Sequence, residues 1–277
     1  MNRITTTFNR LARQRRRALV GYLTAGDPDF DTSFDILQGA VKAGLDVLEL
    51  GVPFSDPTAD GPVIQEASAR ALKSGMTVSR VLDLARRIRA ANATVPIVLF
   101  SYYNPLLHFG LARLAREAVA AGVDGLLLVD LPPEEAGELR TPLAGHDLPL
   151  IRLIAPTTSP ARMADIARDA GGFLYLITRT GVTGAGTLDR ERIRQLAAQL
   201  KELTPLPVCL GFGISTARDV QQLSGLADGV VVGSALVKIV AEHGTNEETA
   251  ALVAEKVREL RAAMAVHLSA QSADSKA

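Results

Sequence analysis

Short apolar segments that alternate with amphipathic ones constrain the fold of this chain more than any other feature. Eight segments have the length and composition of buried strands, at residues 19–23, 47–50, 97–102, 125–129, 150–154, 173–177, 208–210 and 229–232. Between and after them the sequence predicts helices at 31–43, 63–72, 78–90, 111–121, 133–143, 161–169, 188–203, 217–223, 235–241 and 247–267. Eight such units without a break favour an α/β fold of the (β/α)8 TIM barrel type, with extra helices in the βα loops. An open, doubly wound sheet is the alternative.

The two ends of the chain depart from this repeat. Residues 1–17 are basic and contain no acid, as in a transit peptide, but the spacing of Ile4, Phe8 and Leu11 favours a short N-terminal amphipathic helix. From Ser269 onward the residues are small and polar. We therefore expect one barrel domain over residues 1–268 and a disordered tail over 269–277.

Composition excludes several classes of protein. Thirty basic and thirty acidic residues balance, which suggests neither nucleic acid nor an anionic membrane as a partner. No apolar run approaches the roughly 20 residues of a membrane span. The single cysteine, Cys209, lies in an apolar run and cannot form a disulfide framework, so we expect a reducing, cytoplasmic location.

One predicted strand carries an acid in its middle. Side chains alternate across a strand, so Leu48 and Leu50 share one face while Val47 and Glu49 share the other. If helices cover the leucine face, Glu49 points into the barrel, where burial raises the pKa of a carboxyl group. An ion pair with an arginine from a neighbouring strand is the structural alternative.

Two further acids, Asp56 and Asp60, follow in a loop rich in proline and glycine. Asp60 stands just before Gly61-Pro62 and could simply cap the next helix. A strand, an acid, a loop and a second acid in this order are also typical of an active site at the carboxyl end of a parallel strand.

The alternation argument also predicts an apolar pocket at the carboxyl rim. Aromatic and aliphatic side chains would join Glu49 there, namely Tyr22, Phe100, Tyr102, Leu127 and Tyr175. Such a pocket suits a flat hydrophobic substrate. Any one of these residues could be plain barrel core, but as a set they stand out in a chain that is 4% aromatic and has no Trp.

Glycine-rich stretches end the last three predicted strands. Residues 181–186 follow the sixth, Gly211-Phe212-Gly213 ends the seventh and Gly233-Ser234 ends the eighth. Each can present backbone N–H groups without a blocking Cβ, and in barrels this region is the usual phosphate site. Turns need glycine anyway, so the adjacency of the three stretches carries the argument.

Motifs across the chain resemble one enzyme family. Residues 48–62, LELGVPFSDPTADGP, closely resemble the signature of the tryptophan synthase alpha subunit. The same resemblance extends to residues 21–28 (GYLTAGDP), 101–105 (SYYNP), 179–184 (RTGVTG), 211–214 (GFGI) and 233–237 (GSALV). It implies a (β/α)8 lyase that cleaves indole-3-glycerol phosphate to indole and glyceraldehyde 3-phosphate in the last steps of tryptophan biosynthesis.

The resemblance also implies roles for individual residues. Glu49 would be the acid/base, Asp60 would bind the indole nitrogen, and Tyr175 would lie beside the acid. Phosphate and substrate contacts would come from Thr183, Gly184, Phe212, Gly213, Gly233 and Ser234. The implied partner is the beta subunit in an alpha2beta2 heterotetramer, and the expected interface residues are Pro53, Phe54, Asp56, Asn104 and Pro132.

The residues themselves favour acid–base chemistry without cofactor or metal. A Schiff base needs a lysine at a strand end, yet all six lysines fall in predicted helices or the tail. A metal site needs clustered ligands, yet the four histidines are scattered.

Two other functions remain open. An isomerase or epimerase of a sugar phosphate would need a more polar pocket. A regulatory partner without catalysis would not need both Glu49 and Asp60.

Overall fold

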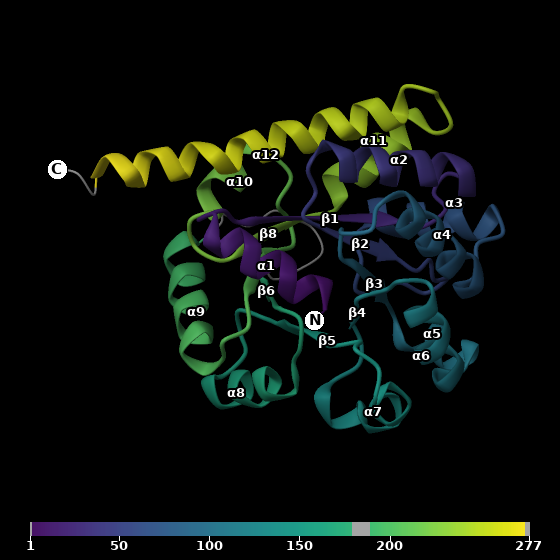
Figure 1. Ribbon diagram of the computed structural model, residues 1–277, viewed down its shortest axis with the longest axis horizontal. Helices are drawn as coiled ribbons and strands as arrows, with labels where there is room; N and C mark the ends of the chain where they lie inside the picture. Colours follow the sequence, from purple (N-terminus) through teal and green to yellow (C-terminus); the bar gives the residue numbers. More distant parts are fainter. Residues whose placement is uncertain (1, 179–188, 275–277) are drawn as a thin grey trace.

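Eight parallel strands close into a barrel in the order of the chain, β1 to β8 (Figure 1). The computed structural model describes residues 2–178 and 189–274, with the backbone alone for 265–274. The strands are β1 (Ala18–Thr24), β2 (Val47–Gly51), β3 (Ile97–Ser101), β4 (Gly125–Leu128), β5 (Leu150–Ile154), β6 (Leu174–Ile177), β7 (Val208–Gly211) and β8 (Gly229–Val232). The predicted TIM barrel is confirmed, and the open doubly wound sheet is wrong.

Helices surround the barrel and also occupy several βα connections. They are α2 (Phe30–Ala43), α3 (Pro62–Lys73), α4 (Val78–Ala91), α5 (Tyr103–Phe109), α6 (Leu111–Ala120), α7 (Gly137–Leu143), α8 (Pro160–Asp169), α9 (Arg190–Leu203), α10 (Ala217–Leu223), α11 (Ser234–His243) and α12 (Thr249–Asp274). Two helices follow each of β2, β3 and β8, which confirms the extra helices expected in the loops. None of the helices in the described part of the chain is long and apolar enough to cross a membrane.

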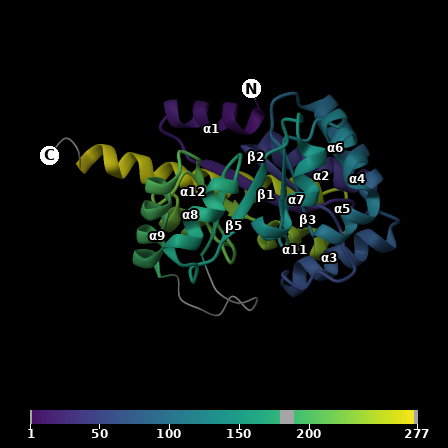
Figure 2. The ribbon, with the colours of Figure 1, turned by 90° about the horizontal axis from the view of Figure 1, so that it is seen from below.

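The N-terminal helix α1 (Arg3–Arg13) packs against the amino end of the barrel. Its apolar stripe is buried, and the Phe8 ring lies 5.7 Å from that of Phe173, just before β6. The Asn2 side chain accepts from the N–H of Ile4 as the helix cap and donates to the carbonyl of Asp124 at 2.8 Å. Figure 2 shows α1, in purple, apart from the helices of the ring. The amphipathic helix expected from the sequence is confirmed.

Some element boundaries differ from the prediction. The third strand ends at Ser101, and Tyr102 is instead the N-cap of the unexpected short helix α5, whose first turn tolerates Pro105. The helix predicted over 133–143 is two pieces, a 3-10 turn (Pro133–Glu135) and α7, which starts at Gly137. The terminal helix α12 continues to Asp274, while the division of the chain at residue 269 stays a prediction.

Aspartates tie neighbouring strands together at the amino end. Asp46, Asp124 and Asp228 each stand immediately before a strand, β2, β4 and β8. Their carboxylates accept the backbone N–H groups of Leu19, Ile97 and Val208 at 2.9, 2.9 and 3.0 Å. Each carboxylate also pairs with arginine or lysine side chains. This end of the barrel is therefore held by satisfied ion pairs.

Candidate active site

Glu49 is a buried acid without a hydrogen-bond partner. It lies in β2 between Tyr22 of β1 and Val98 of β3, and its side chain is fully buried. Both carboxyl oxygens lack a partner among the residues described, so the alternative of a buried ion pair with arginine is wrong. Burial raises the pKa of Glu49 to about 8, and the side chain is therefore mostly protonated at neutral pH.

Asp60 is held differently, by one tyrosine. The Tyr102 hydroxyl donates to Asp60 Oδ2 at 3.0 Å and accepts from the N–H of Ala59 at 2.9 Å. Burial raises the pKa of Asp60 to about 6, and the bond from Tyr102 opposes the rise. Gly61, with no side chain to cap, is the N-cap of α3, so the capping interpretation of Asp60 is wrong.

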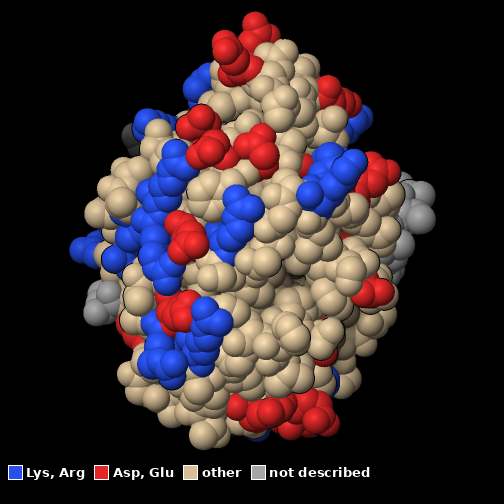
Figure 3. All heavy atoms as spheres, turned by 90° about the vertical axis from the view of Figure 1, so that its right-hand side faces the viewer, with Lys and Arg blue, Asp and Glu red and all other residues tan. Residues whose placement is uncertain are grey.

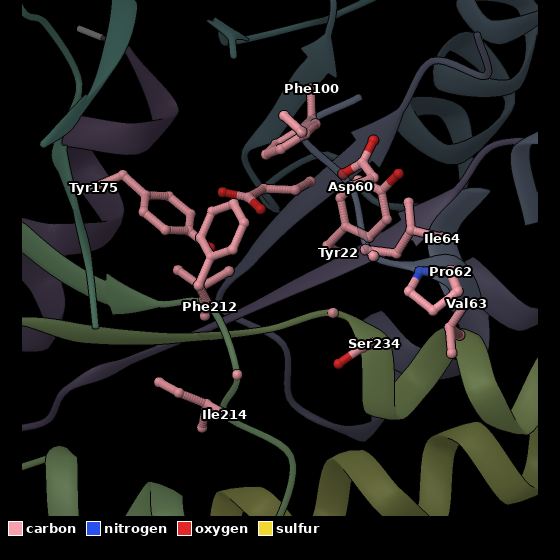
Figure 4. A pocket seen from close by; sticks show the side chains of 16 residues that line it. Tyr22, Asp60, Pro62, Val63, Ile64, Phe100, Tyr175, Phe212, Ile214 and Ser234 are labelled. Carbon is pink, nitrogen blue, oxygen red and sulfur yellow. The ribbon is translucent and has the colours of Figure 1, made fainter. Parts of the chain in front are cut away.

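The two acids face one cavity of about 310 Å³ (Figure 4). Most of the expected rim residues line it together with them: Tyr22, Phe100, Tyr175, Phe212, Gly213, Gly233 and Ser234. Tyr102 reaches the cavity only through Asp60. Leu127 is fully buried on β4, and its contact with substrate stays a prediction. The cavity is chiefly apolar and aromatic, and its lining also includes the two acids and three glycines.

Seven lining residues escaped the sequence argument. They are Ala59, Gly61, Pro62, Val63, Ile64, Ile214 and Val231. Val231 could have been found by strand alternation, because it pairs in register with Val20 of β1. The others lie close to Asp60 or Gly213 in the sequence, in loops and at a helix start, where no simple periodicity tells which side chain faces inward.

Two tyrosines lie over glycines of the neighbouring strand. A Cβ at Gly51 would overlap the Tyr22 hydroxyl, and one at Gly211 would overlap that of Tyr175. The Tyr22 ring meets Phe100 edge-on at 5.0 Å. Burial, followed by the nearby Glu49 charge, raises the pKa of Tyr175 well above its ordinary value, so this phenol stays neutral. Gly51 and Gly211 are thus needed for the pocket's shape, a requirement that only the tertiary contact reveals.

The far side of the cavity is built from backbone. Phe212 and Gly213 have φ values of 70° and 73°, and Thr178 Oγ1 donates to the Phe212 carbonyl at 2.6 Å. A non-glycine residue in this region is strained, and such strain concentrates at functional sites. Ser234 is the first residue of α11, and Gly233 before it places no side-chain cap on the free N–H groups. No Lys or Arg is among the described residues that line the cavity.

Other expected residues lie at the edge of the site or outside the described part. Thr183 and Gly184, with the motif at 179–184, fall outside the described residues. Asp56, Asn104 and Pro132 are exposed. Phe54 is half-buried, with its ring 5.2 Å from that of Tyr102. Pro53 is buried, so the expectation that it offers an exposed contact is wrong.

The face of the molecule that Figure 3 shows carries little charge near its centre. On the face that Figure 3 shows, residues other than Lys, Arg, Asp and Glu surround a hollow, while Lys and Arg gather along one side. An uncharged border of this kind does not attract nucleic acid.

Comparison with known proteins decides the family. Residues 8–265 match the family model described as tryptophan synthase alpha chain. The chain belongs to this family. A tryptophan synthase alpha chain from Desulfosudis oleivorans is 51% identical over 263 residues, which cover 95% of this chain and 99% of that protein.

Solved structures of the family agree with the fold. The tryptophan synthase subunit alpha from Legionella pneumophila is 38% identical, with a TM-score of 0.88 and coverage of 95% of this chain and 98% of that one. A chain of Mycobacterium tuberculosis tryptophan synthase is 34% identical, with a TM-score of 0.86 and coverage of 95% and 98%. The tryptophan synthase alpha chain is a lyase of tryptophan biosynthesis, so the predicted enzyme class is confirmed.

Proposed function

We propose that the cavity around Glu49 and Asp60 cleaves indole-3-glycerol phosphate by acid–base chemistry of this chain's own side chains. The products are indole and glyceraldehyde 3-phosphate. One observation carries the proposal, which is that Glu49 is buried without a partner and faces an apolar cavity shared with Asp60. A carboxyl group kept neutral at pH 7 in this way can donate a proton to carbon.

The reaction begins with protonation of the indole ring. Glu49 gives its proton to carbon 3 of the indole, and the ring becomes a cation whose charge is shared with the nitrogen. Asp60, with a pKa of about 6, is mostly ionised at neutral pH and stabilises this charge at the ring N–H. At neutral pH Glu49 is therefore the protonated acid and Asp60 is the carboxylate, because the two side chains differ in burial and in hydrogen bonding.

Cleavage then returns the proton. The Glu49 carboxylate removes the proton from the hydroxyl group next to the ring, and this carbon becomes the aldehyde. The bond between it and carbon 3 breaks, and its electron pair restores the aromatic indole. Glu49 is protonated again at the end, and no water or redox partner enters the balance.

The phosphate of the substrate has a matching place. Gly213, Gly233 and Ser234 line the same cavity, and among the described residues no N-cap side chain occupies the first N–H groups of the ten-residue helix α11. Backbone donors and the helix dipole favour a phosphate without requiring a basic side chain.

A beta subunit is the proposed partner, in an alpha2beta2 assembly. The M. tuberculosis structure is of tryptophan synthase, and the exposed or half-buried Phe54, Asp56, Asn104 and Pro132 beside the cavity could contact such a partner. Mixing the chain with a beta subunit and measuring mass by light scattering tests the stoichiometry. A cytoplasmic location stays a prediction, testable by cell fractionation.

The test of the reaction is direct. The chain is incubated with indole-3-glycerol phosphate, alone and with a beta subunit, and released indole and glyceraldehyde 3-phosphate are measured. Equal amounts of both products support the proposal. Turnover of a sugar phosphate without indole release would instead support an isomerase, and no turnover in either mixture would support a regulatory role.

A further inference from the structure

A second cavity lies at the amino end of the barrel, away from the acids. Its volume is about 370 Å³, and it lies between the turn after α1 and the helices α2 and α12, which run side by side (Figure 1). Four arginines line it, Arg16, Arg17, Arg258 and Arg261, with Ala43, Ala262 and Met264. We call it the basic pocket. No acid is among the described residues that line it.

The two acids nearest the basic pocket already pair with basic side chains. Asp46 pairs with Arg261 at 2.6 Å, lies 3.7 Å from Arg10, and also accepts a backbone N–H. Asp228 lies 3.7 Å from Arg17 and 3.0 Å from Lys201. Each carboxylate thus serves two cations.

Two of the pocket's arginines remain without an acid. Within the described part of the chain neither Arg16 nor Arg258 forms an ion pair, and Arg16 has only a 3.4 Å bond to the Gln14 side chain. Positive charge therefore remains uncompensated in the basic pocket.

The arginines repel one another in the folded protein. Burial lowers the pKa of Arg261, Asp46 opposes this, and the charges of Arg16 and Arg10 lower the pKa further. Like charges brought together cost free energy unless a counter-charge offsets them. A bound anion would supply that counter-charge.

The backbone holds this arrangement in place. Arg15, directly after the C-cap of α1, has a φ of 53°, a left-handed conformation that glycine or asparagine usually takes. The N–H groups of Arg15 and Arg16 donate to the carbonyls of Ala12 and Leu11 at 3.0 and 2.8 Å. Arg261 Nη1 in turn donates to the Arg17 carbonyl at 3.2 Å. The turn and α12 are therefore joined with their guanidinium groups on the same cavity.

From these contacts we infer that the basic pocket is a binding site for a diphosphate or polyphosphate group. Guanidinium forks match phosphate oxygens in pairs, and the two guanidinium groups without an acid, those of Arg16 and Arg258, offer one fork to each of two linked phosphates. A concave site in a chain of zero net charge suits a small anion better than a nucleic acid. The inference does not depend on the proposed reaction.

Inorganic pyrophosphate is the probe, titrated calorimetrically into the full chain at low salt. The phosphate end of the active cavity can also bind it, so two sites are expected. Ser234→Asp repels an anion from the active cavity and should remove one binding event. The double variant Arg16→Gln/Arg258→Gln should weaken the other by about tenfold or more, since each lost guanidinium removes charged hydrogen bonds to the phosphate oxygens.

A matched control separates the site from general charge. Arg168→Gln/Arg194→Gln removes the same charge from two exposed arginines on α8 and α9, with side chains 75% and 57% exposed. It should leave both events unchanged. The inference is overturned if Ser234→Asp abolishes all binding, or if the control variant weakens binding as much as the pocket variant.

Folding does not obscure the result. Arg16 and Arg258 pair with no described acid, so their replacement should leave the melting temperature without ligand unchanged or slightly higher. The single variant Arg258→Gln, at an exposed position, should still weaken the second event several-fold. Pyrophosphate that raises the melting temperature of Ser234→Asp but not of Arg258→Gln/Ser234→Asp would support the site, whereas equal shifts would refute it.

Discussion

Two buried acids, Asp124 at the amino end of the barrel and Glu49 within β2, lie in opposite environments. At the amino end Asp124 accepts the N–H of Ile97 at 2.9 Å and pairs with Arg3 at 2.9 Å and Arg89 at 2.7 Å. At the carboxyl end Glu49 has no partner among the described residues, and it is fully buried. Both environments occur within four residues of the sequence, since the paired Asp46 directly precedes β2 and Glu49 lies within β2.

The contrast separates stability from chemistry. A buried carboxylate with a full set of donors holds its charge and links neighbouring strands. A buried carboxyl without donors keeps its proton and costs stability, which is the condition a general acid requires. Barrel enzymes place catalysis at the carboxyl ends of strands and stability at the amino ends, and this chain follows that division.

The largest expected effect tests the unpartnered acid. Glu49→Gln should lower kcat by about 10²–10⁴, because the amide cannot give a proton to carbon 3. Folding should be nearly unchanged, since the protonated acid and the amide are similar in shape and charge. Indole release and urea unfolding measure the two effects, with Asp56→Asn as a control that keeps the intrinsic rate. A Gln variant with most of its kcat would show that Glu49 is not the acid.

The partnered acid should behave in the reverse way. Asp124→Ala leaves Arg89, with a side chain only 13% exposed, without its carboxylate and should destabilise the protein by about 3–5 kcal/mol. kcat of the folded protein should hardly change. Asp165→Ala, which breaks the exposed pair with Arg168, is the control and should cost at most about 1 kcal/mol. Equal unfolding curves for the two variants would show that the ion pairs of Asp124 do not stabilise the amino end of the barrel.

The backbone side of the cavity can be tested by one glycine. Gly213→Val places a branched side chain at a residue with φ of 73° and should raise KM for the phosphorylated substrate about tenfold or more. Binding of free indole, measured in parallel, should change less. An unchanged KM would show that the substrate phosphate does not bind at Gly213.

The pH dependence sharpens the same comparison. Because the pKa of Asp60 is about 6 and that of Glu49 is about 8, kcat/KM should fall below about pH 6 and above about pH 8. The pKa of Glu49 is higher in the folded protein than the ordinary value of 4.5. Its contribution to stability is therefore fully present below pH 4.5 and is lost as the pH rises through about 8. In Glu49→Gln this loss of stability with rising pH should be smaller. Parallel pH–stability curves for both proteins would contradict the assignment.

The smallest expected effect concerns the partner. Asp56 is exposed and its carboxylate lies 2.5 Å from the Ser55 hydroxyl, away from the cavity lining. Asp56→Ala should weaken activation by a beta subunit about twofold to tenfold, as a charge at an interface edge does, and leave the basal rate intact. The measurement is indole release against beta-subunit concentration. A lowered basal rate would place Asp56 in the chemistry instead.

The sequence by itself determined the features that depend on local pattern. Apolar runs of strand length predicted the barrel, and alternation along β2 predicted that Glu49 faces inward. Helix α1 followed from the spacing of three apolar residues. The family motif identified Glu49 and Asp60, both of which line the cavity.

Only the tertiary structure decided which residues meet. Asp60 is held by Tyr102 from the end of β3, 42 positions along the chain, and does not cap α3. The need for Gly51 and Gly211 arises from tyrosines on other strands. The basic pocket joins Arg17 to Arg261, which are 244 residues apart. Such contacts depend on strand register and barrel closure, whereas periodicity reports only on neighbours within one segment.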